Sequence, residues 1–361
     1  MDKIVRKILN KIEKNGFEAY VVGGYVRDSI LKKKTFDIDI CTNAVPREIK
    51  RIFPISHIGE YGNVSFKINK YNIEITTYRK EYHYFKRHPQ KIEYINNLVE
   101  DLYRRDFTIN TICMNQKGVV IDLLKGTHDL KNGNIKMIGN PFTRLNEDPL
   151  RILRAIRFAT ILNFKIDEEL KKAIEMNKSE ILKISKNRIK EELDKIFISI
   201  NALQGIALLK QFGIFETLGI NFSKIVKVKT LIGMWAQLDF SADFPFTKED
   251  RNNIIKVKEI VRGNIIDKKV LFNYGLYLSI VAGEVLEVDK VLINKTYKSL
   301  PIYSSNDLAL STNEIKKVLN VKEGKLLGDV IKRIVCEILN ENLKNNKKNL
   351  RKYLEKIKEE I

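Results

Sequence analysis

The sequence predicts an α+β fold, with a mixed sheet and helices in its N-terminal part and helices alone in the rest. Short runs typical of β-strands concentrate before residue 140: AYVVGG, FDIDIC, NVSFKI, NIEITTY and GVVIDL. Five of the seven prolines also lie at or before Pro149. From about residue 144 onward, apolar residues recur at the spacing of α-helices. This change of pattern predicts that a helical region follows the α/β head directly, without a linker.

Helices are predicted on both sides of this change. The first residues, MDKIVRKILNKIEKNGF, predict an amphipathic helix whose charges distinguish it from a signal peptide. Residues 45–53 predict a helix between two strand candidates, and residues 149–164, 167–184 and 187–200 predict three more. The stretch 329–361 is basic and amphipathic, which is typical either of a solvated helix face or of an RNA contact.

The composition predicts a globular protein, because 44% of the 361 residues are hydrophobic. No apolar run reaches the roughly 18 residues of a membrane span, so no membrane partner is expected. The three cysteines, Cys41, Cys113 and Cys336, are widely spaced. They indicate neither a disulfide framework nor a zinc site, and they favour a cytoplasmic location.

The charge balance is strongly basic. Lys and Arg number 65 against 45 Asp and Glu, which gives a formal net charge of +20. An excess of this size favours a polyanionic partner, with nucleic acid as the first candidate. A nucleotide bias that enriches the chain in solvating lysines is the alternative explanation.

Two carboxylates share one face of the predicted strand FDIDI. Because side chains alternate along a strand, Asp37 and Asp39 point one way, while Phe36, Ile38 and Ile40 are expected in the core. Two neighbouring carboxylates repel each other unless a cation lies between them. The pattern therefore predicts a divalent-cation site, and an ordinary edge strand with a wet face is the alternative.

A third carboxylate, Glu74, lies on the predicted strand NIEITTY. If the two strands are neighbours, Glu74 joins Asp37 and Asp39, and three such groups can hold two Mg²⁺ ions. Oxygen ligands suit Mg²⁺, and no cluster of Cys or His nearby indicates another metal.

Two glycines and an arginine precede these carboxylates. Gly23 and Gly24 follow the strand AYVV and open a predicted helix, whose first turn contains Arg27. Glycines let the backbone approach a phosphate closely, and a helix N-terminus favours an anion. A Gly-Gly pair alone predicts no more than a tight turn, but its combination with Arg27 and Asp-x-Asp indicates a nucleotide site.

Four segments together carry a family resemblance: GGYVRDSILKKKTFDIDI, EDLYRRDFTINTI, NEDPLRILRAIRFA and SKNRIKEELDKIF. In order and spacing they resemble the class II tRNA nucleotidyltransferase and poly(A) polymerase family, over roughly residues 20 to 200. The chain length and the region 81–94 are most similar to CCA-adding enzymes, which append C, C and A to tRNA 3′ ends without a nucleic-acid template.

The resemblance implies two-metal nucleotidyl transfer with Mg²⁺, with CTP and ATP as substrates and tRNA as partner. It implies a nucleotidyltransferase palm, or head, at residues 1–140, a helical neck at 141–200, a helical body at 201–300 and a helical tRNA-binding tail at 301–361. Matched to the family motifs, Asp37 and Asp39 are metal ligands and Glu74 is the third acidic residue. The matched nucleotide-binding residues are Gly24, Arg27, Arg105, Asp106, Asn110, Asp148, Arg151, Arg154 and Arg157.

Asp148 and Arg151 suggest how C and A are selected. C and A present an amino donor beside a ring-nitrogen acceptor, which suits a carboxylate and a guanidinium, whereas U and G present the reverse. Asp148 also precedes Pro149 and has the alternative role of a helix N-cap. Arg154 continues the same helix face as Arg151, and Arg157 lies further round it. For Asp106 and Asn110, capping or bracing a helix is the alternative role.

One segment departs from the family. Residues 81–94 match a flexible loop of CCA-adding enzymes, but Lys86 stands where relatives often have an acidic residue. A CC-adding or A-adding specialist therefore remains an alternative, as does a poly(A) polymerase. An inactive RNA-binding protein is the alternative of another class, and the intact Asp37, Asp39 and Glu74 argue against it.

Overall fold

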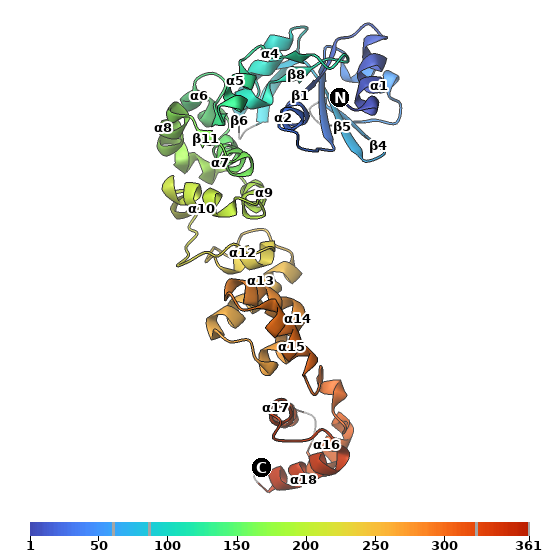
Figure 1. Ribbon diagram of the computed structural model, residues 1–361, viewed down its shortest axis with the longest axis vertical. Coiled ribbons are helices and arrows are strands. Elements are labelled where there is room, and N and C mark those ends of the chain that lie inside the picture. The colour runs from blue at the N-terminus through green and yellow to red at the C-terminus, as the bar shows by residue number, and fades with distance from the viewer. Residues whose placement is uncertain (60–61, 86–87, 322–323, 360–361) are drawn as a thin grey trace. The chain divides into compact units, whose positions relative to one another are not determined.

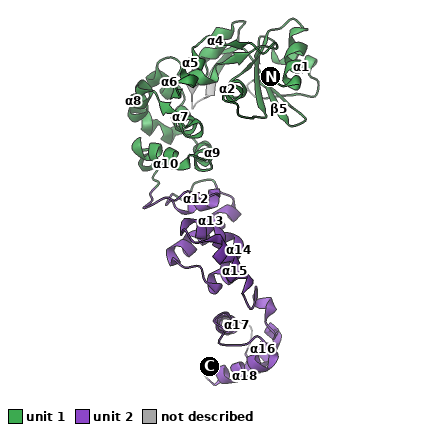
Figure 2. Ribbon diagram, in the orientation of Figure 1, with its two compact units in different colours: residues 1–220, 241–245 green, residues 221–240, 246–361 purple. Residues whose placement is uncertain are grey.

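The computed structural model describes residues 1–59, 62–85, 88–321 and 324–359. The chain forms two compact units, which are coloured in Figure 2. Unit 1 comprises residues 1–220 and 241–245, and unit 2 comprises residues 221–240 and 246–361. The predicted fourfold division into head, neck, body and tail stays a prediction.

Unit 1 begins with a seven-stranded mixed sheet in the order β3-β4-β5-β2-β1-β8-β9 (Figure 1). The neighbours β2 and β5 run parallel, and the other neighbouring pairs in this sheet are antiparallel. The strands are β1 (Ala19–Val22), β2 (Asp37–Thr42), β3 (His57–Ile58), β4 (Val64–Ile68), β5 (Tyr71–Thr77), β8 (Cys113–Met114) and β9 (Val120–Ile121). The predicted runs thus form strands, although GVVIDL contributes only two residues.

Helices cover the sheet because each presents an apolar stripe to it. In α1 (Lys3–Glu13), every third or fourth residue is buried, and α1 packs on β1 and on α3 (Pro46–Ile52). Helix α2 (Gly24–Ile30) follows β1 and packs on β1 and β2. The predicted helices at the N-terminus and at residues 45–53 are present.

A β-hairpin replaces part of the expected flexible loop. Strands β6 (Arg79–Phe85) and β7 (His88–Tyr94) pair antiparallel, from Arg79 opposite Tyr94 to Phe85 opposite His88. The segment expected to be a flexible loop therefore has strand structure in its described part, and its flexibility stays a prediction. The family departure at Lys86 lies outside the described residues.

The rest of unit 1 is almost entirely helical. The predicted helix at residues 149–164 appears as α7 (Leu150–Leu162). The one at 167–184 appears as α8 (Glu168–Asn177) followed by η2 (Lys178–Lys183), and the one at 187–200 appears as α9 (Lys186–Phe197). Strand β11 (Lys165–Ile166) interrupts the region expected to be all-helical, and it pairs in parallel with β10 (Asn134–Ile135) of the predicted head. The other helices of the rest of unit 1 are α4 (Leu98–Tyr103), η1 (Thr108–Asn110), α5 (Gly126–Lys131), α6 (Pro141–Glu147), α10 (Ala202–Gln211) and α11 (Ile214–Thr217).

The chain returns briefly to unit 1 after leaving it. Residues 241–245 belong to unit 1, where the Phe244 side chain is buried and the ammonium of Lys186 lies 4.7 Å from its ring centroid. Lys186 Nζ also pairs with Asp243 Oδ1 at 3.1 Å. These contacts fix the short return segment to the start of α9.

The described secondary structure of unit 2 is helical apart from an isolated antiparallel β-bridge between Asn221 and Asp239. Its elements are α12 (Leu231–Ala236), α13 (Lys248–Gly263), α14 (Lys268–Val285), α15 (Lys290–Lys298), η3 (Ser305–Asp307), α16 (Thr312–Leu319), α17 (Lys325–Leu339) and α18 (Lys347–Lys358). The single tryptophan of the chain, Trp235, is buried against Phe240 and Phe246. Helix α14 breaks at Gly275, whose φ of 76° and ψ of 169° are not helical. The predicted α+β fold, with a helical C-terminal region, is confirmed.

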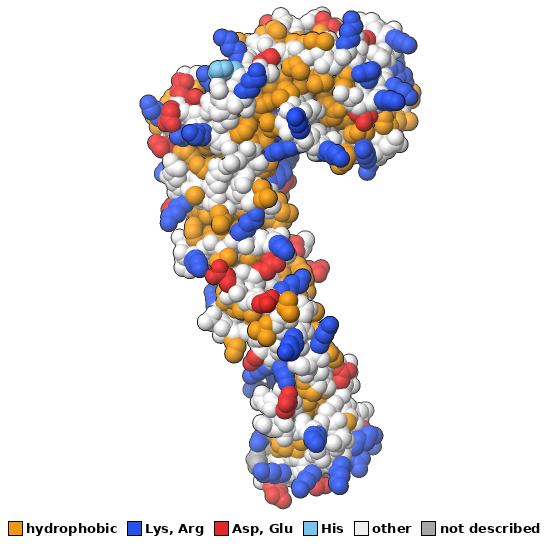
Figure 3. Space-filling model, viewed as in Figure 1, with side chains coloured by type: hydrophobic (Ala, Val, Ile, Leu, Met, Phe, Trp, Pro, Cys, Tyr) orange, Lys and Arg blue, Asp and Glu red, His pale blue; other side chains and the backbone are white. Residues whose placement is uncertain are grey.

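None of the described helices combines the length and the apolar composition that a bilayer crossing requires. On the face drawn in Figure 3, lysine and arginine side chains are distributed over both units, with several gathered near the C-terminal end of unit 2. The basic excess of the sequence thus covers extended surfaces.

Candidate functional site

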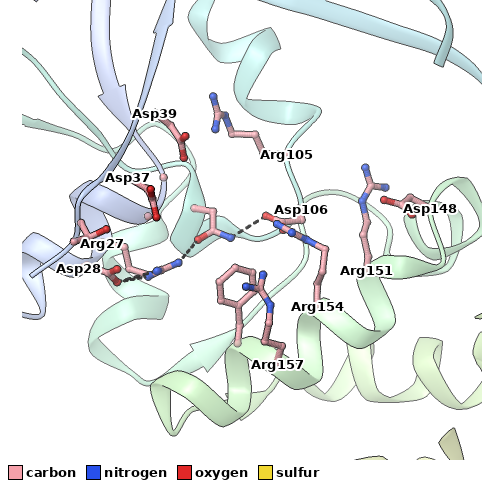
Figure 4. A pocket seen from close by; sticks show the side chains of 15 residues that line it. Arg27, Asp28, Asp37, Asp39, Arg105, Asp106, Asp148, Arg151, Arg154 and Arg157 are labelled. Carbon is pink, nitrogen blue, oxygen red and sulfur yellow. Dashed lines mark hydrogen bonds and ion pairs between the residues drawn. The ribbon is translucent and has the colours of Figure 1, made fainter. Parts of the chain in front are cut away.

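A cleft of about 480 Å³ lies in unit 1, between β2, helix α2 and helix α7 (Figure 4). We call it the main cleft. Eleven of the twelve predicted site residues line it: Gly24, Arg27, Asp37, Asp39, Arg105, Asp106, Asn110, Asp148, Arg151, Arg154 and Arg157. These residues are distant in sequence, and the fold brings them to one cavity, although their individual roles stay predictions. The twelfth, Glu74, lines two neighbouring clefts together with Asp39.

Strand β2 presents the two aspartates. Asp37 and Asp39 are exposed on one face, and Ile38 and Ile40 are buried on the other, as the alternation predicts. Phe36 was also expected in the core, but it precedes the strand and is 45% exposed. Its ring instead packs at the surface, which its position before the first paired residue allows.

Glu74 lies beside the aspartates because β2 and β5 are parallel neighbours. Asp39 stands opposite Glu74 in the register, and Asp37 stands opposite Asn72, whose amide donates to Asp37 Oδ1 at 2.7 Å. The pKa of Asp39 is raised, first because the walls of the cleft partly desolvate the carboxylate although the residue is exposed, and also because the negative charges of Glu74 and Asp37 lie near it; Arg105 opposes the shift. Such mutual repulsion is relieved when a cation is bound.

The chemistry of the two aspartates fits a Mg²⁺ ion. Asp37 and Asp39 supply two carboxylates on one rigid strand, which is the oxygen chemistry that Mg²⁺ prefers. Among the described residues, no three His, Cys, Asp or Glu side chains are grouped closely enough to hold a metal by themselves. Glu74 Oε1 accepts a 2.9 Å hydrogen bond from Asn63 Nδ2.

A chain of hydrogen bonds crosses the cleft from α2 to α7. Arg27 Nη1 donates to Asn110 Oδ1 at 2.7 Å, and Asn110 Nδ2 donates to Asp106 Oδ1 at 2.9 Å (Figure 4). Arg154 Nε donates to Asp106 Oδ2 at 2.9 Å. The bracing role that the sequence left open for Asp106 and Asn110 is therefore present, in residues that also line the cleft.

Asp106 is held ionised by this network. Burial alone would raise the pKa of its carboxyl, but the Arg154 guanidinium and the hydrogen bonds from Asn110 and from the Phe107 amide lower the pKa well below its ordinary value. Arg105 is similarly anchored, because its Nη2 lies 3.4 Å from Oδ2 of the fully buried Asp101. The cleft is thus lined by fixed charges.

Phe158 lies on α7 and lines the main cleft. Three guanidinium groups lie near its ring. Their central carbons are 4.2 Å (Arg157), 5.2 Å (Arg27) and 5.5 Å (Arg154) from the ring centroid. The ring therefore supports three arginines through cation–π contacts. Arg157 also pairs with the buried Glu192, at 2.7 Å between Nε and Oε2.

The proposed base-reading residues lie at the start of α7. Leu150 N donates to Asp148 Oδ1 at 3.1 Å, so the Asp148 side chain caps the first amide of α7, although Pro149 occupies the N-cap position. Arg151 is buried, and its Nη1 donates to the Arg144 carbonyl at 2.8 Å. Both residues line the main cleft, and Arg151 also lies 3.4 Å from Glu147, between Nη1 and Oε2.

Other lining residues were not predicted as site residues: Gly23, Asp28, Thr35 and Phe158. Gly23 has a φ of 75°, and a Cβ there would lie 3.7 Å from Asp39 Oδ2. The Gly-Gly pair was the available signal, but it did not show which glycine has the unusual backbone. Arg144 was also missed, and its Nη2 donates to the carbonyls of Arg104 and Arg105 at 2.7 and 2.8 Å.

Comparisons with known proteins cover nearly the whole chain. Residues 19–136 match the model of the poly A polymerase head domain, and residues 163–219 match the "Probable RNA and SrmB- binding site of polymerase A". Residues 249–354 match a model of tRNA nucleotidyltransferase domain 2. The CCA-adding enzyme of Enterococcus faecalis is 34% identical over 365 residues, which cover 91% of this chain and 89% of that enzyme. The chain belongs to the CCA-adding enzyme family.

Further relatives agree with this assignment. The CCA-adding enzyme of Ligilactobacillus salivarius is 32% identical over 368 residues, covering 91% of this chain and 89% of that enzyme. The fold matches the Bacillus stearothermophilus CCA-adding enzyme in complex with CTP, with a TM-score of 0.86, 22% identity and coverage of 99% and 98% of the two chains. It also matches the Thermotoga maritima CCA-adding enzyme complexed with tRNA, with a TM-score of 0.70, 23% identity and coverage of 99% and 96%. The predicted family is confirmed.

Proposed function

We propose that this member of the CCA-adding enzyme family appends C, C and A to the 3′ end of tRNA, using CTP and ATP and no nucleic-acid template. The observation that supports this most directly is the convergence of eleven motif residues on the main cleft. A cleft with two carboxylates on one side and several arginines on the other suits a metal-bound triphosphate. Because the net charge is +20, electrostatic attraction favours a tRNA substrate.

We further propose roles for the individual residues. Asp37 and Asp39 would hold Mg²⁺, with Glu74 beside them. Bound Mg²⁺ supplies charge neutralisation of the triphosphate and activation of the RNA 3′ hydroxyl. Arg27 and Arg105 bind triphosphate oxygens, since each guanidinium is fixed beside the carboxylates by a partner of its own.

Asp148 and Arg151 select the base. Asp148 accepts from the exocyclic amino group of C or A, and Arg151 donates to the adjacent ring nitrogen. U and G would leave both residues facing a group of the wrong polarity, at a cost of about 1–3 kcal/mol for each unsatisfied group. Arg154 and Arg157, supported by Phe158, complete the wall of the cleft.

The division of labour along the chain follows from the same proposal. The head at 1–140 carries transfer, the neck at 141–200 reads the base, and the body at 201–300 and tail at 301–361 bind tRNA. The match of residues 163–219 to an RNA-binding model supports the RNA role of the helical part. We also expect a reducing, cytoplasmic environment, since Cys41, Cys113 and Cys336 are free thiols.

The test is the product formed on a tRNA that ends at the discriminator base. We expect CTP alone to add two cytidines and stop, and CTP with ATP to complete CCA, as read by sequencing the products. Long adenosine tails would indicate a poly(A) polymerase, and a stop at CC with both nucleotides present would indicate a CC-adding specialist. Asp39→Asn should lower transfer by at least roughly a thousandfold, because loss of a metal site costs several kcal/mol.

The matched control for Asp39→Asn is Glu168→Gln, an exposed carboxylate in unit 1 whose ion pair with Lys171 lies at the surface. It should transfer nucleotides like the wild type. Transfer by Asp39→Asn within about tenfold of the wild type would contradict the metal role.

A further inference from the structure

Three clefts of unit 1 share the carboxylate of Asp39. The main cleft is the proposed nucleotide site. A second cleft of about 350 Å³ contains His57 and Lys67, and we call it the His57 cleft. A third cleft of about 490 Å³ contains Asn63, Glu74, Arg79, Arg104, Arg105 and Arg154, and we call it the arginine cleft. Two of these clefts are not assigned by the proposed function.

Nucleotidyl transfer brings two substrates to Asp39. The RNA 3′ oxygen bonds to the α-phosphorus, its hydroxyl proton passes to solvent, and the bond to the bridging oxygen breaks to release pyrophosphate. Because attack is in line with the leaving group, the RNA end has to reach Asp39 from outside the volume that the triphosphate occupies. The arginine cleft satisfies this requirement, since it shares Asp39, Arg105 and Arg154 with the main cleft.

The charges of the arginine cleft favour a phosphodiester. Four arginines line it with two carboxylates, Asp39 and Glu74, so an entering group meets more positive than negative side chains. Arg79 Nη2 lies 2.7 Å from Glu81 Oε1, and Arg104 Nε lies 2.8 Å from Asp101 Oδ1. Both guanidiniums are thus fixed in position while they line the cavity.

The His57 cleft offers the opposite charge balance. Asp37, Asp39 and Glu74 line it, and Lys67 is the one lysine among its described lining residues. A phosphodiester entering there would meet three carboxylates, which repel it. The arginine cleft is therefore the better site for the RNA end.

We propose that the arginine cleft binds the sugar-phosphate backbone at the RNA 3′ end, with Arg79 and Arg104 contacting the last phosphodiester. The proposal rests on the proposed function. None of the described residues that line this cleft is aromatic, so the cleft offers no aromatic ring for a base to stack on. Recognition of the backbone alone suits an RNA end whose last base changes from the discriminator to C and then to C again.

The test combines a protein variant with an RNA whose last phosphodiester is replaced by an uncharged methylphosphonate. With this RNA, the kcat/KM of the wild-type protein for the first C addition should fall roughly tenfold relative to the native RNA, because a hydrogen bond to a charged group is removed. With the native RNA, the kcat/KM of Arg79→Gln should be lower than that of the wild type by about the same factor. Changing to the methylphosphonate RNA should then lower the kcat/KM of Arg79→Gln by less than about threefold.

Lys67→Gln, in the His57 cleft, is the matched control and should show the full tenfold difference between the two RNAs. CTP affinity of Arg79→Gln should stay within about threefold of wild type, since Arg79 does not line the main cleft.

The outcomes separate the two proposals. Additive losses in Arg79→Gln, or a wild-type protein that extends native RNA but ignores the methylphosphonate, would overturn the subsite alone. Loss of sensitivity in Lys67→Gln would also overturn it, by moving the RNA end to the His57 cleft. A wild-type protein that extends no RNA would overturn the proposed function and the subsite with it. If Arg79→Gln does not fold, Arg104→Gln can be measured with the same two RNAs. The comparison of the native and the methylphosphonate RNA with the wild-type protein requires no variant.

Discussion

The pair between Asp106 and Arg154 allows a quantitative test of how the cleft is held together. The Asp106 side chain is 10% exposed and accepts from Arg154, from Asn110 and from the Phe107 amide. Removing one partner from a buried pair costs about 3–5 kcal/mol. Because the Arg154 side chain remains 33% exposed, solvent reduces this cost, and we expect Asp106→Asn to lower the free energy of unfolding of unit 1 by about 2 kcal/mol.

Hydrogen exchange can measure this loss within one unit. The chain has two compact units, so a single global transition is not a safe measure of unit 1. A loss of 2 kcal/mol should make the amides of α7 exchange roughly 30-fold faster, while those of α17 in unit 2 keep their rates. Glu168→Gln removes a surface ion pair on α8 and is the matched control, for which we expect less than about 0.5 kcal/mol.

The pH dependence gives a second measurement. The pKa of Asp106 is lower in the folded than in the unfolded protein, because Arg154 and the hydrogen bonds outweigh burial. Such a group stabilises the fold fully above the unfolded pKa of about 3.9, and this stabilisation is lost as the pH falls below that value. The difference between wild type and Asp106→Asn should therefore be constant from about pH 7 to 5 and shrink below about pH 4. Equal exchange rates in the two proteins at pH 7, or a difference that does not change with pH, would refute the reasoning.

Three further predictions concern other positions. Asp148→Ala should reduce discrimination against UTP and GTP about tenfold, measured with each nucleotide singly; a lower melting temperature with unchanged nucleotide choice would leave Asp148 only its capping role. Phe158→Leu should weaken CTP binding about tenfold in calorimetry, because three guanidiniums lose their cation–π support; unchanged affinity would mean that the ring is not needed to position them. Gly275→Ala should destabilise unit 2 by about 1–3 kcal/mol in denaturation followed by Trp235 fluorescence, since the backbone there is accessible only to glycine. Gly328→Ala, at a helical position with open space around the Cβ, should be neutral or stabilising.

Local periodicity predicted much of the fold. The alternation in FDIDI placed Asp37 and Asp39 on one face of β2, and helical spacing located α7 with its arginines. The structure was harder to predict for segments whose sequence is compatible with more than one kind of element. The residues 79–94 are mixed polar and aromatic, so only the observed pairing of β6 with β7 identifies a hairpin. Phe36 has the right spacing for the core but lies one residue before the strand.

The cleft was predictable where the chemistry is local and unpredictable where it depends on tertiary packing. Paired carboxylates or a pair of glycines can be recognised from a few consecutive residues of the sequence. Phe158 has the spacing of a core residue, and its contact with three guanidiniums arises only when α2 and α7 meet. Arg144 supports the segment that carries Arg105 through bonds to backbone carbonyls, which leave no trace in side-chain patterns.

The return of residues 241–245 to unit 1 limits how the protein can be taken apart. The chain passes between the units three times, after residues 220, 240 and 245, so no single cut yields both units complete. A fragment that ends at residue 220 would lack Phe244, whose ring is buried in unit 1. The apolar surface that this ring covers would then be exposed to water. Such a fragment should tend to aggregate. Recombination that transfers unit 1 to another protein would therefore have to transfer two separate pieces of coding sequence. The two units are thus encoded by interleaved segments of the sequence, and they would be inherited together.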